Sequence, residues 1–154
     1  LTAMMADMLL ERDDVRQDMD ESMRPLWVWH AIEETEHKAV AYDVFQAAGG
    51  TYAERAFYLM FSTAALGVMS TYFTSRMMLN DRKNFSLVDT ATGLWRLWGV
   101  NGTFSSLIPT WLEYFKPGFH PWDHDNSDLI ARFKEEIQAH IAPQYKKGNR
   151  RTLQ

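Results

Sequence analysis

The longest run without a formal charge, residues 56–75, restricts the fold more than any other part of the chain. About 20 mostly apolar residues can cross a bilayer as a helix, or form the central helix of a bundle. A capping box over residues 51–54 precedes the run and predicts a helix that continues to about residue 79. Serine and threonine residues dilute the hydrophobicity of the run, and Arg55 and Arg76 flank it on both sides. We therefore expect a buried bundle helix, with a membrane-embedded or membrane-surface helix as the alternative.

The rest of the chain carries helix signals and almost no strand signals. No stretch alternates valine, isoleucine and threonine around a hairpin turn. The sequence therefore predicts an all-α fold, a single helical-bundle domain over residues 1–154. Apart from the helix that follows the capping box, we expect helices over residues 1–12, 22–48, 86–98, 105–115 and 128–141. Ser22 is the expected cap of the second of these, and Gly49 and Gly50 are expected to end it.

Composition excludes several classes of function. The net charge of −4 gives no support for a nucleic-acid partner. The chain has no cysteine, which excludes disulfides and thiolate metal sites and favours the cytoplasm. It also lacks Gly-x-Ser-x-Gly, a phosphate loop and Gly-x-Gly-x-x-Gly. Because the chain begins with Leu1 rather than methionine, we expect it to be the C-terminal part of a longer protein.

The expected helix over residues 22–48 carries His30, Glu34 and His37 at spacings of four and three residues. With about 100° per residue, these side chains and that of Glu33 fall within one arc of roughly 100°. The same side carries apolar residues: Met23, Leu26, Trp27, Ala41, Val44 and Phe45. A narrower apolar line on the opposite side contains Val28, Ile32 and Ala39, so we expect the helix to be central to a bundle, with neighbours covering both sides.

Ionisable side chains within an apolar stripe need compensation, because an unpaired buried charge is costly. A metal ion would supply it, since imidazole and carboxylate are common ligands of divalent metals. The spacing therefore predicts a metal site with His30, Glu34 and His37 as ligands. Glu33 is the candidate catalytic carboxylate, either bridging two ions or orienting a histidine. The alternative is that these histidines and glutamates simply pair with one another.

One helix cannot close a coordination sphere, so the remaining ligands must come from facing helices. Residues 34–37 read Glu-x-x-His, the element that dinuclear carboxylate bundles repeat on two helices. We therefore expect two ions. Imidazole and carboxylate without thiolate favour iron, with manganese or zinc as alternatives.

Other candidate residues have plainer interpretations. His120 lies in a proline-rich turn, where we expect it to hydrogen bond to backbone. Glu36, Lys38 and Asp43 are expected in solvent or in salt bridges between helices. The six tryptophans and nine methionines are expected to pack the core, with an apolar substrate pocket as the alternative.

Residues 26–44 and 114–122 resemble the two signatures of the bacterial "predicted metal-dependent hydrolase" family. They read Leu-Trp-Val-Trp-His-Ala-Ile-Glu-Glu-Thr-Glu-His-Lys-Ala-Val-Ala-Tyr-Asp-Val and Tyr-Phe-Lys-Pro-Gly-Phe-His-Pro-Trp. The resemblance implies an all-helical, ferritin-like protein with a carboxylate and histidine metal site. Members of that family are about twice as long, and their N-terminal Gly-Glu and Gln-Glu-x-x-His-x-x-x-His motifs are absent here. The pattern of His30, Glu34 and His37 is also similar to that of p-aminobenzoate N-oxygenase-type di-iron enzymes.

Two functions follow as hypotheses. The first is a metal-dependent enzyme that acts on a small, apolar substrate, either by activating O₂ or by activating water on a metal. The second is a non-catalytic helical module that associates with a membrane or a partner through residues 56–75. Association into homo-oligomers is compatible with both hypotheses.

Overall fold

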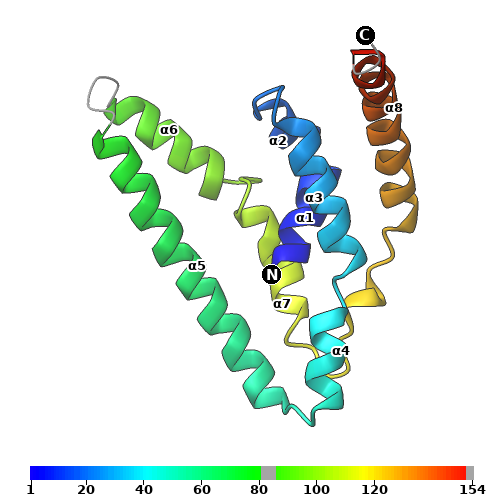
Figure 1. The fold of residues 1–154 in the computed structure, drawn as a ribbon. Helices are drawn as coiled ribbons and strands as arrows, with labels where there is room; N and C mark the ends of the chain where they lie inside the picture. The colour runs from blue at the N-terminus through cyan, green and yellow to red at the C-terminus, as the bar shows by residue number, and fades with distance from the viewer. Residues whose placement is uncertain (81–85, 152–154) are drawn as a thin grey trace. The chain divides into compact units, whose positions relative to one another are not determined.

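The computed structural model describes the backbone of residues 1–80 and 86–151, and the side chains of residues 1–80 and 86–139. Within these residues the fold is all-α, as the sequence predicts, and no strand is present. Two 3-10 turns, Ser105–Leu107 and Pro121–Asp123, accompany the α-helices. The helices (Figure 1) are α1 (Thr2–Glu11), α2 (Asp13–Gln17), α3 (Arg24–Glu36), α4 (Val40–Ala47), α5 (Tyr52–Asn80), α6 (Leu87–Trp98), α7 (Ile108–Glu113) and α8 (Ser127–Arg151).

The chain divides into two compact units. One contains residues 2–41 and 121–154, and therefore α1, α2, α3 and α8; we call it the α3 unit. The other contains Leu1 and residues 42–120, and therefore α5, α6, α7 and most of α4; we call it the α5 unit. The single domain expected over residues 1–154 stays a prediction.

The core of the α3 unit lies between α1, α3 and α8. Its buried residues are Ala6, Leu9, Leu10, Val28, Ala31, Ile32, Phe133 and Ile137. The predicted burial of both sides of α3 is therefore only half right: the line containing Val28 and Ile32 is buried, but the prediction is wrong for the side with Leu26 and Trp27, which is exposed. The physical reason is that α1 and α8 both pack against the Val28 side, and a helix face is buried only where a neighbour covers it.

The predicted helix over residues 22–48 is in fact two helices, α3 and α4, separated by a turn at residues 37–39. Lys38 lies in this turn, where its ammonium group donates to Asn126 Oδ1 at 2.6 Å and to the carbonyl of His124. The same ammonium lies 4.5 Å from the centre of the Trp122 ring. These contacts hold the chain in a turn that local helix propensity does not predict, because tertiary contacts outweigh propensity.

The ends of α3 and α4 only partly follow the sequence signals. Ser22 does not cap α3: its hydroxyl bonds to Asp20, and Met23 is the N-cap residue without a side-chain hydrogen bond. Pro25 lies in the first turn of α3, as expected. Gly49 follows α4 with φ 80°, the left-handed conformation that ends a helix and that glycine adopts without strain.

Arg16 of α2 donates hydrogen bonds to carbonyl groups at the C-terminal end of α1. Its side chain is buried, and it donates to the carbonyl of Leu9 at 2.6 Å and to that of Leu10. It also pairs with Asp13, and its guanidinium lies 4.8 Å from the centre of the Phe133 ring. The last carbonyls of a helix have no partner within the helix, so this arginine supplies the missing donors.

In the α5 unit, the capping box forms as predicted. The backbone N–H of Thr51 donates to Glu54 Oε2 at 2.8 Å, and the N–H of Glu54 donates to Thr51 Oγ1 at 3.3 Å. The helix that follows, α5, has 29 residues and ends at Asn80, close to the expected end.

The expected burial of α5 is wrong. Its buried residues are Arg55 and Leu59, and only 6% of its most apolar 18-residue window is buried. By length and composition, α5 could cross a membrane. Contacts from α4 and α7 reach the beginning of α5, where the Trp111 indole N–H donates to Thr63 Oγ1 at 3.0 Å. Beyond that point most described side chains of α5 are exposed.

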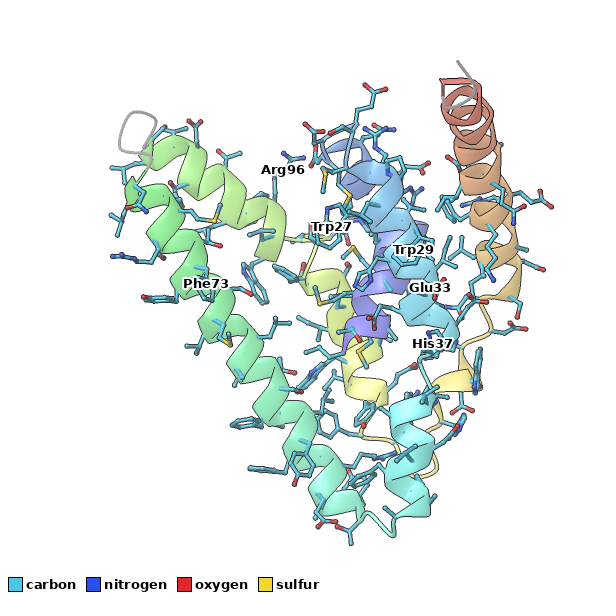
Figure 2. All side chains as sticks on the ribbon, viewed as in Figure 1. Trp27, Trp29, Glu33, His37, Phe73 and Arg96 are labelled. Atoms are coloured by element: carbon cyan, nitrogen blue, oxygen red, sulfur yellow. The ribbon has the colours of Figure 1, made fainter. Side chains whose placement is uncertain are left out.

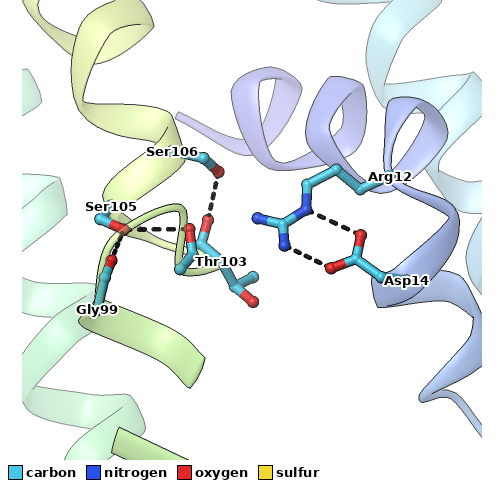
Figure 3. A network of polar contacts seen from close by, with 7 residues as sticks. Arg12, Asp14, Gly99, Thr103, Ser105 and Ser106 are labelled. Atoms are coloured by element: carbon cyan, nitrogen blue, oxygen red, sulfur yellow. Dashed lines mark hydrogen bonds and ion pairs between the residues drawn. The ribbon is translucent and has the colours of Figure 1, made fainter. Parts of the chain in front are cut away.

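The remaining helices differ from expectation mainly at their ends. Ser86 caps α6, since its hydroxyl accepts from the N–H of Asp89 at 3.2 Å. The helix expected over residues 105–115 is a 3-10 turn followed by the short α7. In this turn, the Ser105 hydroxyl bonds to the carbonyl of Gly99 at 2.6 Å (Figure 3). The helix α8 begins near the predicted residue but continues to Arg151, ten residues beyond the predicted end.

Candidate functional site

The helix α3 places His30 and Glu34 one turn apart on an exposed face. His30 Nε2 lies 3.7 Å from Glu34 Oε1, and the two side chains are 53% and 34% exposed. The Trp27 ring meets the His30 ring edge-on, with 6.2 Å between centroids. The spacing of four residues therefore brings the imidazole and the carboxylate together, as the sequence predicts, but at the surface and not in the core.

The other two predicted residues lie in the same segment, Glu33 just before Glu34 and His37 three residues after it. Glu33 is half-buried, and His37 is exposed at the C-cap of α3 with φ −96° and ψ 9°. Figure 2 shows Trp29, Glu33 and His37 following one another down this segment of the chain. Because α3 ends at Glu36, His37 belongs to the turn and not to the continuous helix from which its position was predicted.

The spacing of these donor atoms can be compared with the spacing of ligands around a divalent metal ion. Two ligands of one tetrahedral ion lie about 3.4 Å apart when each bond is about 2.1 Å long. The His30 to Glu34 distance of 3.7 Å is close to this value, so the pair fits a divalent cation in both donor type and spacing. Within residues 1–80 and 86–139, no group of three or more His, Asp or Glu residues is placed to hold an ion. The pair therefore offers two donors, and His37 as a third ligand stays a prediction.

In the same unit, a polar cluster joins α1 to the loop before α8. Asp7 accepts from the amide of Asn126, which in turn accepts from Lys38. Burial raises the pKa of Asp7 above its ordinary value of 3.8, although Lys38 opposes the shift. Burial likewise lowers the pKa of Lys38, against the attraction of Asp7 and Asp125. In both groups, removal from water outweighs the opposite charge nearby.

The raised pKa of Asp7 predicts an unusual pH dependence. The folded state holds the Asp7 proton more tightly than the unfolded state, so the stability contributed by this group is lost as the pH rises above about 4. We expect Asp7→Asn to gain stability relative to the wild type between pH 4 and neutrality, measured by urea unfolding at a series of pH values.

Asp20 provides a matched control, because its effect on stability should change with pH in the opposite direction. Hydrogen bonds from Ser22 lower the pKa of the exposed Asp20, so its contribution is lost as the pH falls through the pKa of the folded state. Asp20→Asn should therefore lose stability relative to the wild type above about pH 4. A difference between Asp7→Asn and the wild type that does not change with pH would contradict the burial of this carboxyl group.

In the α5 unit, the structure pairs two residues that the sequence left outside the site. His120 Nε2 lies 3.0 Å from Asp43 Oδ1, and the His120 ring stands edge-on to Tyr42 with 5.2 Å between centroids. His120 therefore has a carboxylate partner, and its expected hydrogen bond to backbone stays a prediction. The Asp43 carboxylate fixes the orientation of the imidazole ring.

Arg55 is the buried centre of an aromatic cluster in this unit. Its guanidinium donates to the Tyr42 hydroxyl at 3.0 Å and to the Lys116 carbonyl at 3.1 Å. It also lies within 5.9 Å of four ring centres, those of Tyr42, Tyr52, Tyr114 and Phe119. Burial raises the pKa of Tyr114, and the Arg55 charge acts against that shift. The cluster therefore fixes the backbone next to His120.

The residues of this cluster were not part of the predicted site, but one feature of the sequence pointed to them. Tyr42 and Asp43 lie in the first segment that resembles the hydrolase family, and Phe119 and His120 lie in the second. The structure joins these segments directly: Tyr42 donates to the Phe119 carbonyl, and Asp43 bonds to His120. Glu36, which was expected in solvent or in a salt bridge, pairs with Lys134 of α8 at 2.6 Å.

Comparison with known proteins agrees with the resemblance. The family described as "predicted metal-dependent hydrolase" matches residues 1–125, which include both segments. No curated protein and no solved structure matches the chain. The ferritin-like arrangement of the helices stays a prediction.

Proposed function

Because the chain belongs to the family of predicted metal-dependent hydrolases, we propose that it hydrolyses a small, apolar substrate with the help of a divalent metal. The observation that carries the proposal is the approach of His30 and Glu34 to 3.7 Å on an accessible helix face. The argument from buried charge no longer applies, because this face is exposed; the proposal rests on the donor pair and on the family match. Ion pairing alone would not require the second histidine, His37, within the next turn.

Each residue has a distinct proposed task. His30 and Glu34 hold the metal, and His37 approaches as a third ligand. The bound metal supplies a positive charge that polarises the scissile group and acidifies water. Glu33, which is half-buried on the same helix, orients a histidine or accepts a proton.

The identity and number of ions form the finer part of the proposal. Imidazole and carboxylate suit iron, manganese and zinc, and we propose iron in a dinuclear site. Such a site would also permit O₂ activation. Elemental analysis of the purified chain gives the stoichiometry, and an absorption spectrum recorded in air detects an oxo-bridged iron pair in the near ultraviolet.

A metal titration with matched variants tests the ligands. We expect Glu34→Gln and His30→Ala each to weaken binding of Co²⁺ or Zn²⁺ by at least about tenfold, measured by isothermal titration calorimetry. Glu36→Gln is the control: Glu36 is the second glutamate of the same Glu-x-x-His element, but it is paired with Lys134. It should bind metal as the wild type does.

Hydrolysis provides the second readout. Chelation should abolish cleavage of esters with short apolar acyl groups, and the same divalent metal should restore it. Glu33→Gln should lower turnover: if Glu33 accepts the proton, metal affinity should change little, and if it orients a histidine, metal affinity should fall as well. Equal metal affinity in the wild type, His30→Ala and Glu34→Gln would contradict the proposal.

A further inference from the structure

We propose that α5 inserts into the hydrocarbon core of a lipid bilayer through residues 56–75. This stretch contains no charged residue, and at about 1.5 Å per residue it is about 30 Å long, the thickness of that core. Its most apolar part is almost entirely exposed in the structure. The inference is independent of the hydrolytic site, which lies on another helix in the other unit.

One side of α5 carries large, apolar side chains. Counting about 100° per residue, Phe57, Phe61, Val68 and Tyr72 fall within one arc of about 60°. Their exposed fractions are 62%, 61%, 71% and 58%. We call this the aromatic face. Soluble monomers rarely leave a contiguous apolar surface of this kind open to water.

Apolar side chains are also exposed on the other sides of α5. Met60, Leu66 and Met69 lie away from the aromatic face and are 52%, 41% and 57% exposed. A second copy of the chain or a protein partner would cover one face of the helix. A bilayer contacts a helix on all sides, so exposure around the circumference favours lipid as the occupant.

The opposite face distinguishes a spanning helix from one that lies on the membrane surface. Helices that lie in the interface carry a strongly charged polar face. Here the corresponding positions are Thr63, Gly67, Ser70 and Thr74, which are small and uncharged. Thr63 and its neighbour Ser62 bond back to carbonyls of the preceding turn, both at 2.7 Å. Hydroxyl groups that are satisfied within the helix are tolerated in hydrocarbon.

The ends of α5 match the two boundaries of a bilayer. At the first end the charge of Arg55 is enclosed by aromatic rings and carbonyls. At the other end Tyr72 and Phe73 precede Arg76, and Figure 2 shows Phe73 projecting from α5. Aromatic residues followed by a basic residue are enriched where hydrocarbon meets the headgroups.

The absence of cysteine allows a direct test on the full chain. Val68→Cys is labelled with the environment-sensitive fluorophore NBD and mixed with phosphatidylcholine vesicles. We expect its emission to shift to the blue, to rise several-fold, and to be quenched by lipids with a nitroxide on the acyl chain. Val44→Cys is the matched control, because Val44 is 65% exposed on α4 and should respond to neither treatment.

A second variant tests the same surface without a label. Val68→Arg should lower co-flotation with the vesicles at least about tenfold, whereas Val44→Arg should float as the wild type does, with circular dichroism confirming the helix content of both. The proposal is overturned if NBD at residue 68 does not respond to vesicles. It is equally overturned if the blue shift appears without lipid and follows a dimer seen by light scattering.

Discussion

Replacing Arg16 by methionine is expected to lower the stability of the α3 unit by about 3 kcal/mol. The variant keeps most of the side-chain volume but removes the donors to the carbonyls of Leu9 and Leu10. An unsatisfied buried polar group costs about 1–3 kcal/mol, and two carbonyls lose their donor together. Native-state hydrogen exchange of the α1 and α3 amides measures the loss within this unit.

The control is an arginine in the same region with an exposed partner. Arg12 donates to Asp14 at 3.0 Å from Nε, and the two side chains are 26% and 65% exposed (Figure 3). Surface pairs of this kind contribute about 0–1 kcal/mol, so Arg12→Met should change the exchange rates little. Equal effects of the two variants would show that burial of Arg16 is not what makes its contacts important.

Replacing Arg55 by methionine should lower the stability of the aromatic cluster by about 2 kcal/mol. The change removes the donor to the Tyr42 hydroxyl and the cation that faces the Tyr114 ring. Hydrogen exchange of the α4 amides and of the first turns of α5 is the appropriate measurement, because the contacts of Arg55 lie in those segments.

The matched control lies on the same helix. Arg76 is exposed, and Arg76→Met should leave the exchange of those amides unchanged. A second readout is specific to the charge of Arg55, which lowers the pKa of Tyr114 against the effect of burial. Without that charge, the Tyr114 phenol should titrate at higher pH, seen in ultraviolet difference spectra against Tyr114→Phe. An unchanged titration would contradict the contact between the two side chains.

Helix type and several helix ends could be predicted because their causes are local. The reciprocal bonds of Thr51 and Glu54, the Ser86 cap and the left-handed Gly49 each depend on residues within one turn. The spacing of His30 and Glu34 likewise brings their side chains together, because neighbours four apart on a helix share a face. None of these features requires knowledge of what packs against the helix.

The burial of each face could not be predicted in the same way. Both sides of α3 are apolar in sequence, and only the packing of α1 and α8 on the Val28 side decided which one is covered. The end of α3 before His37 depends on the contacts of Lys38 with Asn126 and Trp122, nearly ninety residues away in the chain.

The amino-acid sequence by itself therefore determined the all-α class, most helix starts and the pairing of His30 with Glu34. Only the tertiary structure decided that this pair is exposed, that α5 is uncovered and that Asp43 meets His120. The physical reason is the distance along the chain over which each interaction acts. Hydrogen bonds that start and end helices act over a few residues, whereas burial and distant side-chain pairs depend on which helices meet.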